Sequence, residues 1–230
     1  FWPKVLVYSN YVKNYIDEWW HTNAFIFPPA IDCREFQTLK KENIILSVGR
    51  FFPLPHSKKQ EVLVSAFKNL YKKGLRDWKL ILAGGVDSKG EKYFQSIKDQ
   101  ARDLPVEFYP NIERKQLLKL YGSAKLYWHA TGFGENLTEN PERAEHFGIT
   151  ILEAMASGCA PLVYPYGGPK EIVENNVNGL YWKSTQELAT KTLSLIKNET
   201  YCNNLSKKAI KRAKSYDIDN FAKELYSLVG

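Results

Sequence analysis

From residue 44 onward the chain alternates between short apolar runs and longer amphipathic segments. The apolar runs are predicted strands at residues 44–48, 79–83, 106–109, 126–129, 160–163 and 180–182. The amphipathic segments are predicted helices at residues 58–73, 91–104, 113–123, 149–157, 169–175, 184–197, 199–214 and 218–228. Strands separated by helices of this length form βαβ units. The sequence therefore predicts an α/β fold with a Rossmann-like parallel sheet and helices on both faces.

The residues ahead of this alternation read as a smaller unit. Residues 5–9 and 24–27 are predicted strands, the first of them buried, and residues 10–20 are a predicted helix with an apolar face. Pro28 and Pro29 end the second strand, and the polar segment that runs to Asn43 is typical of a linker. We place a domain boundary near Pro28.

Composition narrows the classes of protein. With 230 residues, 44% hydrophobic and 25% charged, the chain resembles ordinary soluble globular proteins. Its apolar runs are far shorter than the roughly 20 residues that span a bilayer. Three cysteines without motif spacing indicate neither a disulfide framework nor a zinc site, and they fit a reducing, cytoplasmic compartment.

The formal net charge of +7 raises the question of an anionic partner. Much of that charge lies in residues 207–214, where Ala209, Ile210 and Ala213 give the segment one apolar side. We interpret it as a helix with a solvated basic face, and a weak role at a membrane surface stays open. No nucleic-acid-binding signature is present, which argues against a nucleic-acid partner.

The most informative stretch is E-H-F-G-I-T-I-L-E-A-M-A-S-G, from Glu145 to Gly158. Phe147 and Gly148 predict a turn, and the helix that follows presents its first free N–H groups and partial positive charge to a ligand such as phosphate. Glu153 lies about one turn into that helix, and Glu145 precedes it. This layout suits a nucleotide sugar. The alternative is an apolar core helix with a favourable charge near its start.

Ligands of parallel sheets bind beyond the carboxyl ends of the strands. Arg50 directly follows the first strand of the alternation, and Lys58 begins the next predicted helix. An arginine and a lysine at these points can clamp a diphosphate, the arginine by its fork and the lysine as a point charge. Two solvated surface cations are the alternative.

Taken together, these segments resemble a known family. The segments S-V-G-R-F, L-I-L-A-G-G, E-H-F-G-I-T-I-L-E-A-M-A-S-G and G-G-P-K-E-I-V follow one another in the order found in the donor-binding domain of family-4 retaining glycosyltransferases. These enzymes have the GT-B fold, and their hallmark is a pair of glutamates separated by seven residues. Glu145 and Glu153 match that pair.

The resemblance implies a role for each matching residue. Arg50 and Lys58 would hold the donor diphosphate and stabilise the leaving nucleotide, Glu145 would contact the donor sugar, and Glu153 would bind the ribose. The remaining residues that it places at the donor are Gly49, Lys59, Asn111, Ile112, His146, Phe147, Gly148, Ile149 and Thr150. Among them, Asn111 and Ile112 would lie at the base, and the residues from Phe147 to Thr150 would offer donors to sugar and phosphate.

The sequence departs from the family pattern in the loop between Arg50 and Lys58, which is longer than usual. Whether Lys58 or Lys59 meets the diphosphate is therefore open. No metal or other cofactor is implied, because cations and helix N–H groups can stabilise the diphosphate. Asp217-Ile218-Asp219 is interpreted as a cap of the last helix and not as a metal site.

The resemblance also implies a longer enzyme. Residues 1–28 would be the remnant of an N-terminal acceptor domain with its linker, residues 29–216 the donor-binding domain, and residues 217–230 a helix crossing back. The chain alone would transfer little or nothing. The donor would be a UDP-, GDP- or ADP-sugar and the acceptor an unknown sugar or lipid-linked molecule, in polysaccharide or glycolipid synthesis. The location would be cytoplasmic, with possible peripheral contact at the inner membrane surface.

Two alternatives of other classes remain. One is a catalytically silent nucleotide-binding or interaction domain, and the other is a basic Rossmann-like nucleic-acid binder. The long loop of residues 131–146 either closes over the donor sugar, with Gly132 and Gly134 as hinges, or is a disordered surface loop. His129, at a strand end, is interpreted as a core histidine.

Overall fold

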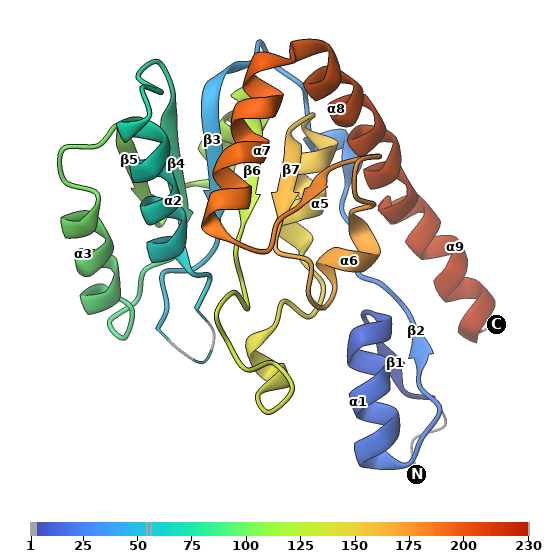
Figure 1. The fold of residues 1–230 in the computed structure, drawn as a ribbon. Helices are drawn as coiled ribbons and strands as arrows, with labels where there is room; N and C mark the ends of the chain where they lie inside the picture. The colour runs from blue at the N-terminus through green and yellow to red at the C-terminus, as the bar shows by residue number, and fades with distance from the viewer. Residues whose placement is uncertain (1–3, 54, 56, 230) are drawn as a thin grey trace.

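The computed structural model describes residues 4–53, 55 and 57–229. Its centre is a six-stranded sheet in the order β5-β4-β3-β6-β7-β8, in which all neighbouring strands are parallel. The strands are β3 (Glu42–Val48), β4 (Lys79–Gly84), β5 (Val106–Pro110), β6 (Ala124–His129), β7 (Ala160–Val163) and β8 (Leu180–Tyr181). The predicted α/β fold with a parallel sheet is confirmed (Figure 1).

The strand order reverses between β3 and β6. From β3 the chain moves outward through β4 and β5, and it then returns to the other side of β3 and continues through β7 to β8. The loops leaving β3 and β6 therefore diverge to opposite faces of the sheet. Such a switch point leaves a crevice at the carboxyl ends of the two strands, where ligands of these sheets bind.

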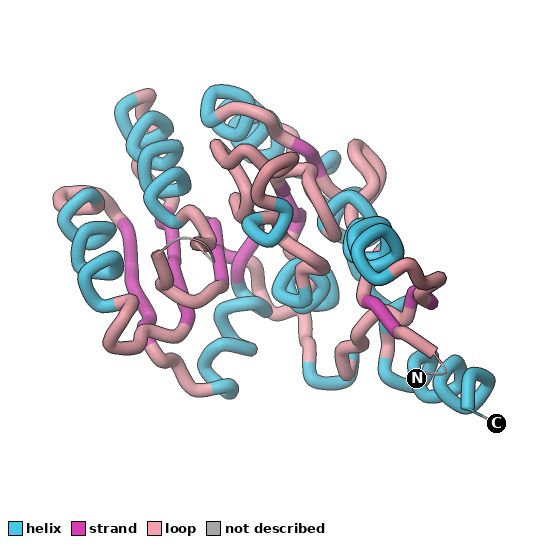
Figure 2. Tube along the Cα trace, turned by 90° about the horizontal axis from the view of Figure 1, so that it is seen from below, coloured by secondary structure: helices cyan, strands magenta, loops and turns pink. Residues whose placement is uncertain are grey.

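Helices cover both faces of the sheet, as Figure 2 shows in the view from below. They are α2 (Gln60–Lys72), α3 (Glu91–Gln100), α4 (Arg114–Ser123), α5 (Ile149–Ala156), α6 (Pro169–Ile172), α7 (Thr185–Lys197) and α8 (Glu199–Ala213). The last helix, α9 (Ile218–Val229), follows α8 and extends beyond the sheet (Figure 1). One apolar cluster joins the sheet to α2, α3 and α7, and a second joins it to α4 and α5. α8 contributes to both clusters.

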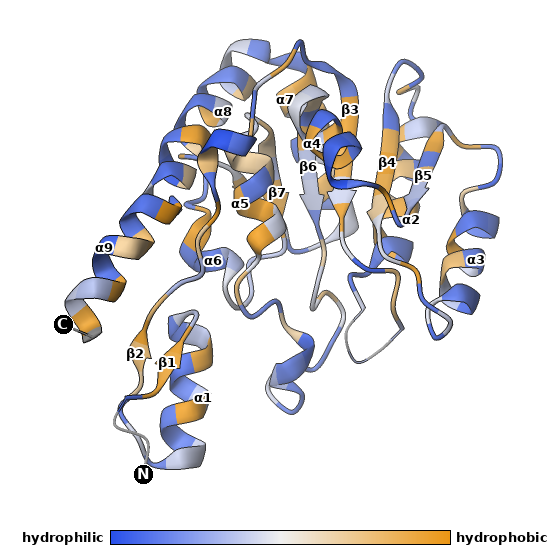
Figure 3. Ribbon diagram, turned by 180° about the vertical axis from the view of Figure 1, so that it is seen from behind, coloured by the Kyte–Doolittle hydropathy of each residue, from blue (hydrophilic) through white to orange (hydrophobic). Residues whose placement is uncertain are grey.

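The period of two along β3 explains why both clusters form. Ile45 packs in the first cluster, while its neighbours Ile44 and Leu46 pack in the second. Successive side chains of a strand point to opposite faces, so a strand covered on both sides must be apolar throughout. Figure 3 shows this arrangement, with hydrophobic strands between helices whose outer faces are hydrophilic.

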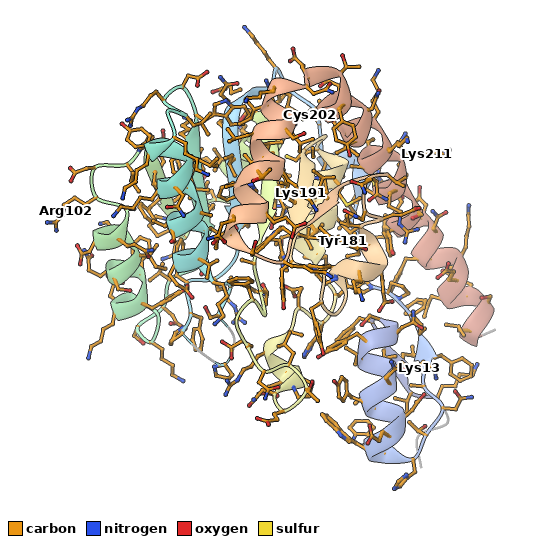
Figure 4. All side chains as sticks on the ribbon, viewed as in Figure 1. Lys13, Arg102, Tyr181, Lys191, Cys202 and Lys211 are labelled. Carbon is orange, nitrogen blue, oxygen red and sulfur yellow. The ribbon has the colours of Figure 1, made fainter. Side chains whose placement is uncertain are left out.

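The basic segment on α8 has the predicted solvated face. Ala209 and Ala213 are fully buried, whereas Lys207, Lys208 and Lys211 are exposed. Figure 4 shows Lys211 pointing away from the sheet. No helix in the described part of the chain has both the length and the apolar character to cross a bilayer.

Three predicted helix boundaries are wrong. α2 begins at Gln60 rather than at residue 58, because Lys59 adopts the left-handed conformation with φ of 58° and becomes the N-cap. α3 ends at Gln100, short of the predicted residue 104. α6 ends at Ile172, and Asn175 forms an isolated bridge with Gly179 where the prediction continued the helix.

The N-terminal unit consists of β1 (Leu6–Val7), α1 (Asn10–Trp20) and β2 (Phe25–Ile26), with the two strands parallel. The predicted buried strand at residues 5–9 is wrong in length and burial, since Leu6 is 44% exposed and the side chain of Ser9 caps α1. The carboxylate of Glu171, next to the end of α6, accepts the backbone N–H groups of Asn10 and Tyr11 and ties α1 to the main domain. Residues 1–3 of the predicted N-terminal remnant lie outside the described residues.

The predicted linker that runs to Asn43 is shorter than expected, because β3 begins at Glu42, and it has some structure of its own. It contains the short helix η1 (Cys33–Glu35), and Ile31 bridges to Asp217 at the start of α9. The Asp217 carboxylate accepts the backbone N–H groups of Asp219 and Cys33, each at 3.0 Å. Asp217 therefore caps α9, as the sequence predicted.

Candidate functional site

A groove of about 340 Å³ lies at the switch point, between the loop after β3 and the start of α5. It contains most of the side chains that the sequence singled out. The predicted residues that line it are Gly49, Lys58, Glu145, His146, Phe147, Gly148, Ile149 and Thr150. Tyr8, Pro29 and Val48 complete its wall. The structure thus brings residues from five separate segments into one concave site.

Other predicted residues lie beside this groove. Arg50 and Asn111 line a neighbouring groove of about 170 Å³ that follows the ends of β3 and β5. The Asn111 side chain accepts the N–H of Val86 at 2.9 Å and donates to its carbonyl at 3.2 Å, so it holds the turn after β4. Ile112 is half-buried directly after Asn111 and is not among the residues that line either groove.

Glu145 is the most densely contacted carboxylate of the groove. Its Oε2 atom lies 2.6 Å from Nζ of Lys58, 3.2 Å from Nε2 of His129 and 3.2 Å from Oγ1 of Thr131. Burial raises the pKa of Glu145, but the hydrogen bond from His129 and the charge of Lys58 outweigh it, so that this pKa is held far below its usual range. Glu145 is therefore a fixed anion facing a fixed cation.

We expect this ion pair to make the stability of the fold depend on pH. A folded-state pKa below the unfolded value, about 4.3 for glutamate, contributes stability that is complete above that value and is lost as the pH falls toward the folded pKa. Glu145→Gln should lower the free energy of unfolding by about 1–3 kcal/mol at about pH 7. Urea denaturation should show that the deficit shrinks as the pH is lowered to about 3.

Glu139→Gln is the control for this measurement, because it removes an exposed carboxylate from the same loop. A deficit of Glu145→Gln that stayed constant from neutral to acid pH would contradict the assignment of a stabilised anion at Glu145.

The sequence treated His129 as a core histidine, and the structure adds a contact that this interpretation did not include. The ring is buried, as expected, but Nε2 contacts Glu145, and Nδ1 has no partner among the described residues. Burial lowers the pKa of His129 despite the nearby carboxylate. Thr131, two residues further on, was also missed. His129 ends β6 and Thr131 lies just after it, and that position alone marked them for inspection.

The structure gives different contacts to Lys58 and Lys59, the two lysines that the sequence left open as ligands of the diphosphate. Lys58 reaches Glu145 in the groove, whereas Nζ of Lys59 pairs with Glu135 in the loop of residues 131–146. Gly49 makes room for Lys58, since a Cβ at position 49 would lie 2.7 Å from its Cγ. The long loop before Lys58 contains residues 54 and 56, which lie outside the described residues.

The start of α5 is shaped by Gly148. This residue is the N-cap with φ of 108°, a conformation that glycine adopts without strain. The helix N-terminus at Ile149 and Thr150 then opens into the groove, with free N–H groups and a partial positive charge. The Thr150 hydroxyl accepts a hydrogen bond of 2.8 Å from Tyr127, so its own proton is available to a ligand.

Glu153 lies one turn into α5, as predicted, but it is 9% exposed and is not among the residues that line the groove. Oε1 lies 2.7 Å from Nη1 of Arg114, and Oε2 lies 2.8 Å from the hydroxyl of Tyr121. Arg114 also bridges to Glu35 at 2.7 Å. Sequence reasoning missed both α4 partners of Glu153, although Arg114 begins the helix that follows β5.

The G-G-P-K-E-I-V segment, which begins at Gly167, contacts the backbone of the site at Glu145. The N–H of Gly168 donates to the carbonyl of Glu145 at 2.9 Å, and a Cβ at Gly167 would lie only 2.2 Å from that carbonyl oxygen. The hydroxyl of Ser9 donates to the carbonyl of His146 at 2.7 Å. Backbone contacts from two distant segments therefore fix the chain at Glu145 and His146.

The loop of residues 131–146 packs against the domain. The ring of Phe133 lies 5.5 Å from that of Tyr164 and 5.0 Å from that of Trp182. Glu135 pairs with both Lys59 and Arg143, and Leu137 is buried. The interpretation as a disordered surface loop does not fit these contacts.

Comparison with known proteins places this geometry in a family. Residues 32–212 match the model of the glycosyl transferases group 1 family. The chain belongs to this glycosyltransferase family. The predicted resemblance to GT-B glycosyltransferases is thereby confirmed, and the group 1 chain also has a fold shared with solved enzymes of that class.

Curated relatives of this group 1 glycosyltransferase include mannosyltransferases. The GDP-Man:Man(3)GlcNAc(2)-PP-Dol alpha-1,2-mannosyltransferase of Dictyostelium discoideum is 24% identical over 98% of this chain and 46% of its own length. The protein of the same name from Xenopus tropicalis is 30% identical over 72% of this chain and 34% of its own length. The chain thus spans about half, or less, of the relatives that it matches.

Among solved structures, Anabaena Alr3699/HepE in complex with UDP and glucose superimposes with a TM-score of 0.84. The match covers 100% of this chain and 63% of that protein at 19% sequence identity. A glycosyltransferase from Rickettsia africae matches with a TM-score of 0.81 over 98% of this chain and 62% of its own. At such identities the likeness establishes the fold.

Proposed function

We propose that the groove binds a nucleoside-diphosphate hexose and that the whole protein transfers the hexose, with retention of anomeric configuration, to a sugar or lipid-linked acceptor. One observation carries this proposal: Lys58, Glu145 and the N-terminus of α5 line a single groove. A cation and free N–H groups suit a diphosphate, and a fixed carboxylate suits sugar hydroxyl groups. We assign the diphosphate to Lys58 and the N-terminus of α5, and the hexose to Glu145.

The charges of the groove match the chemistry of this transfer. When the bond between sugar and phosphate breaks, negative charge grows on the departing diphosphate and positive charge on the sugar. Preorganised donors that face the growing charge lower the barrier. In the proposal, Lys58, the N–H groups at the start of α5 and the adjacent Arg50 stabilise the leaving group. The anionic Glu145 lies on the sugar side, and no metal or other cofactor is assigned.

Glu153 is proposed to bind the ribose. Both of its oxygens already accept a hydrogen bond, from Arg114 and Tyr121. Each carboxylate oxygen has two lone-pair sites, so a ribose hydroxyl can be added without breaking either contact. The two existing bonds would then hold the carboxylate in place for the ligand, while Asn111 and Ile112 are assigned to the base.

The relatives support a nucleotide-sugar donor but differ in the nucleotide and the sugar. The mannosyltransferases carry GDP-Man in their names, and the Anabaena structure contains UDP and glucose. The PP-Dol in those same names supports a lipid-linked acceptor. We also propose a cytoplasmic site of action with peripheral contact at the inner membrane surface. The donor proposal concerns the chain of residues 1–230, and transfer is proposed for the whole protein.

Calorimetric titration of the chain with UDP, GDP and ADP, each with and without attached glucose or mannose, tests the proposal. We expect one nucleotide to bind and to stabilise the fold by up to a few kcal/mol when it is well above its Kd. Glu153→Ala should weaken binding of the nucleotide itself by about tenfold or more. Glu145→Ala should remove the extra affinity that the sugar gives and leave the bare nucleotide bound.

Glu139→Ala, on the exposed part of the loop, is the control and should bind like the parent. If the parent binds none of the nucleotides, the proposal is wrong. If Glu145→Ala and Glu153→Ala both bind like the parent, the ligand occupies another site.

A further inference from the structure

The two oxygens of Glu145 have different surroundings. Oε2 receives three donors from two segments: Lys58 before α2, and His129 and Thr131 at the end of β6 and just after it. Oε1 receives no donor from any residue that the structure describes. The Glu145 side chain is only 15% exposed, and it lines the groove. Oε1 is therefore the oxygen left for a ligand.

Three donors on one oxygen immobilise the carboxylate more strictly than one ion pair would. A single Lys–Glu contact allows rotation about the last torsion of the glutamate, because that torsion is broad. Three donors held by two separate segments restrict this rotation and fix the position of Oε1. A ligand hydroxyl that binds Oε1 then meets an acceptor of defined position.

Lys58 is a less constant partner than the other two. In the proposed function it also binds the donor diphosphate, so its ammonium group must serve two anions once the donor is bound. His129 and Thr131 are almost completely buried, with 4% exposure each, and neither is among the residues that line the groove. They can hold Glu145 in the free and in the donor-bound state alike.

The protonation state of His129 follows from its contacts. Burial lowers its pKa, so the ring is neutral at about pH 7. A neutral ring that hydrogen-bonds a carboxylate must place its proton on the nitrogen at that contact, which is Nε2. Nδ1 is then an unprotonated, buried nitrogen, and it has no partner among the described residues.

We propose that His129 and Thr131 are positioning residues that orient the Glu145 carboxylate so that one oxygen, Oε1, reads a hydroxyl group of the transferred hexose. This inference rests on the proposed function, because it assigns the hexose to Glu145. It makes two buried side chains outside the groove wall determinants of sugar discrimination. Neither residue is assigned a contact with the donor.

The test compares the Kd of the nucleoside diphosphate with the Kd of its hexose conjugate, using whichever nucleotide binds the parent chain. Thr131→Val and His129→Phe each remove one donor to a charged oxygen and nearly preserve shape. Each should reduce the ratio of the Kd of the bare nucleotide to the Kd of its hexose conjugate by about tenfold, while the affinity for the bare nucleotide stays within about twofold. His129→Gln, which restores an N–H donor, should recover part of the ratio.

Thr192→Val is the matched control. Thr192 is a fully buried threonine whose hydroxyl accepts a hydrogen bond of 3.2 Å from the Trp128 ring, and it is not among the residues that line the groove. Its removal should leave the ratio unchanged. Nitrogen-15 NMR of the parent should show the neutral His129 ring protonated on Nε2 at about pH 7, and the spectra of all variants report whether each one is folded.

Different results bear on different claims. A ratio that is unchanged in both Thr131→Val and His129→Phe overturns the inference while nucleotide binding upholds the proposed function. A parent that binds nucleotide and conjugate equally well also overturns it, because Glu145 then reads no sugar. If the parent binds no nucleotide, the proposed function fails and the inference fails with it.

Discussion

Replacing Gly167 with alanine is expected to lower the free energy of unfolding by about 3–5 kcal/mol. Two effects act at this position. The residue has φ of 71°, where side chains other than glycine are strained. A Cβ there would also lie 2.2 Å from the carbonyl oxygen of Glu145, which is backbone and has no rotamer with which to move away.

Gly134→Ala separates these two effects. Gly134 has a similar φ of 78° and lies in the loop before Glu145, but a Cβ there would meet nothing within 4 Å. Its cost should be only the strain of the backbone, about 1 kcal/mol. Urea denaturation of the parent and both variants measures the difference, and equal losses would mean that the close approach to Glu145 is relieved by small shifts.

The substitution Gly167→Ala should also affect ligand binding. The carbonyl that Gly167 approaches is held by the N–H of Gly168 at 2.9 Å, so relief of the clash must move either Glu145 or the start of α6. Under the proposed function, Gly167→Ala should therefore lose sugar discrimination even at temperatures where it is folded. Gly134→Ala should keep it.

The fold was predictable because both of its signals are local. A mostly apolar run such as residues 44–48, in which only Ser47 is polar, is typical of a strand covered on both faces, and the period of the following segment identifies the helix that covers it. The errors arose where one residue decides the boundary. Lys59 adopts a left-handed conformation that is rare for lysine, so α2 begins only at Gln60, and nothing in the local pattern predicts this.

The candidate site was predictable only in part. Residues that lie next to a strand end or a helix start, such as Lys58 and Gly148, could be found from the chain alone because parallel strands end at one edge of the sheet. The partners of the two glutamates could not. His129 reaches Glu145 across 16 positions and Arg114 reaches Glu153 across 39, and such contacts depend on how the elements pack.

Replacing Lys58 with methionine is expected to have the largest effect on ligand binding. Methionine keeps the length and the apolar stem but loses the charge, so the affinity of the chain for a nucleoside diphosphate should fall by about 100-fold. The expected loss is large because the groove is partly buried, where charges interact more strongly than in water. The pKa of Glu145 should rise from its depressed value, because Lys58 is one of the two groups that lower it.

Lys59→Met tests the neighbouring lysine, which the sequence could not exclude as the ligand of the diphosphate. Nζ of Lys59 pairs with Glu135, whose side chain is 8% exposed, so its removal should cost about 1–3 kcal/mol of stability while nucleotide affinity is kept. Arg143, at 2.8 Å, continues to neutralise Glu135 and limits the loss. Calorimetry on the two variants then assigns the diphosphate. A loss of affinity in Lys59→Met alone would transfer that role to Lys59. Unchanged affinity in both variants would contradict the assignment of the diphosphate to either lysine.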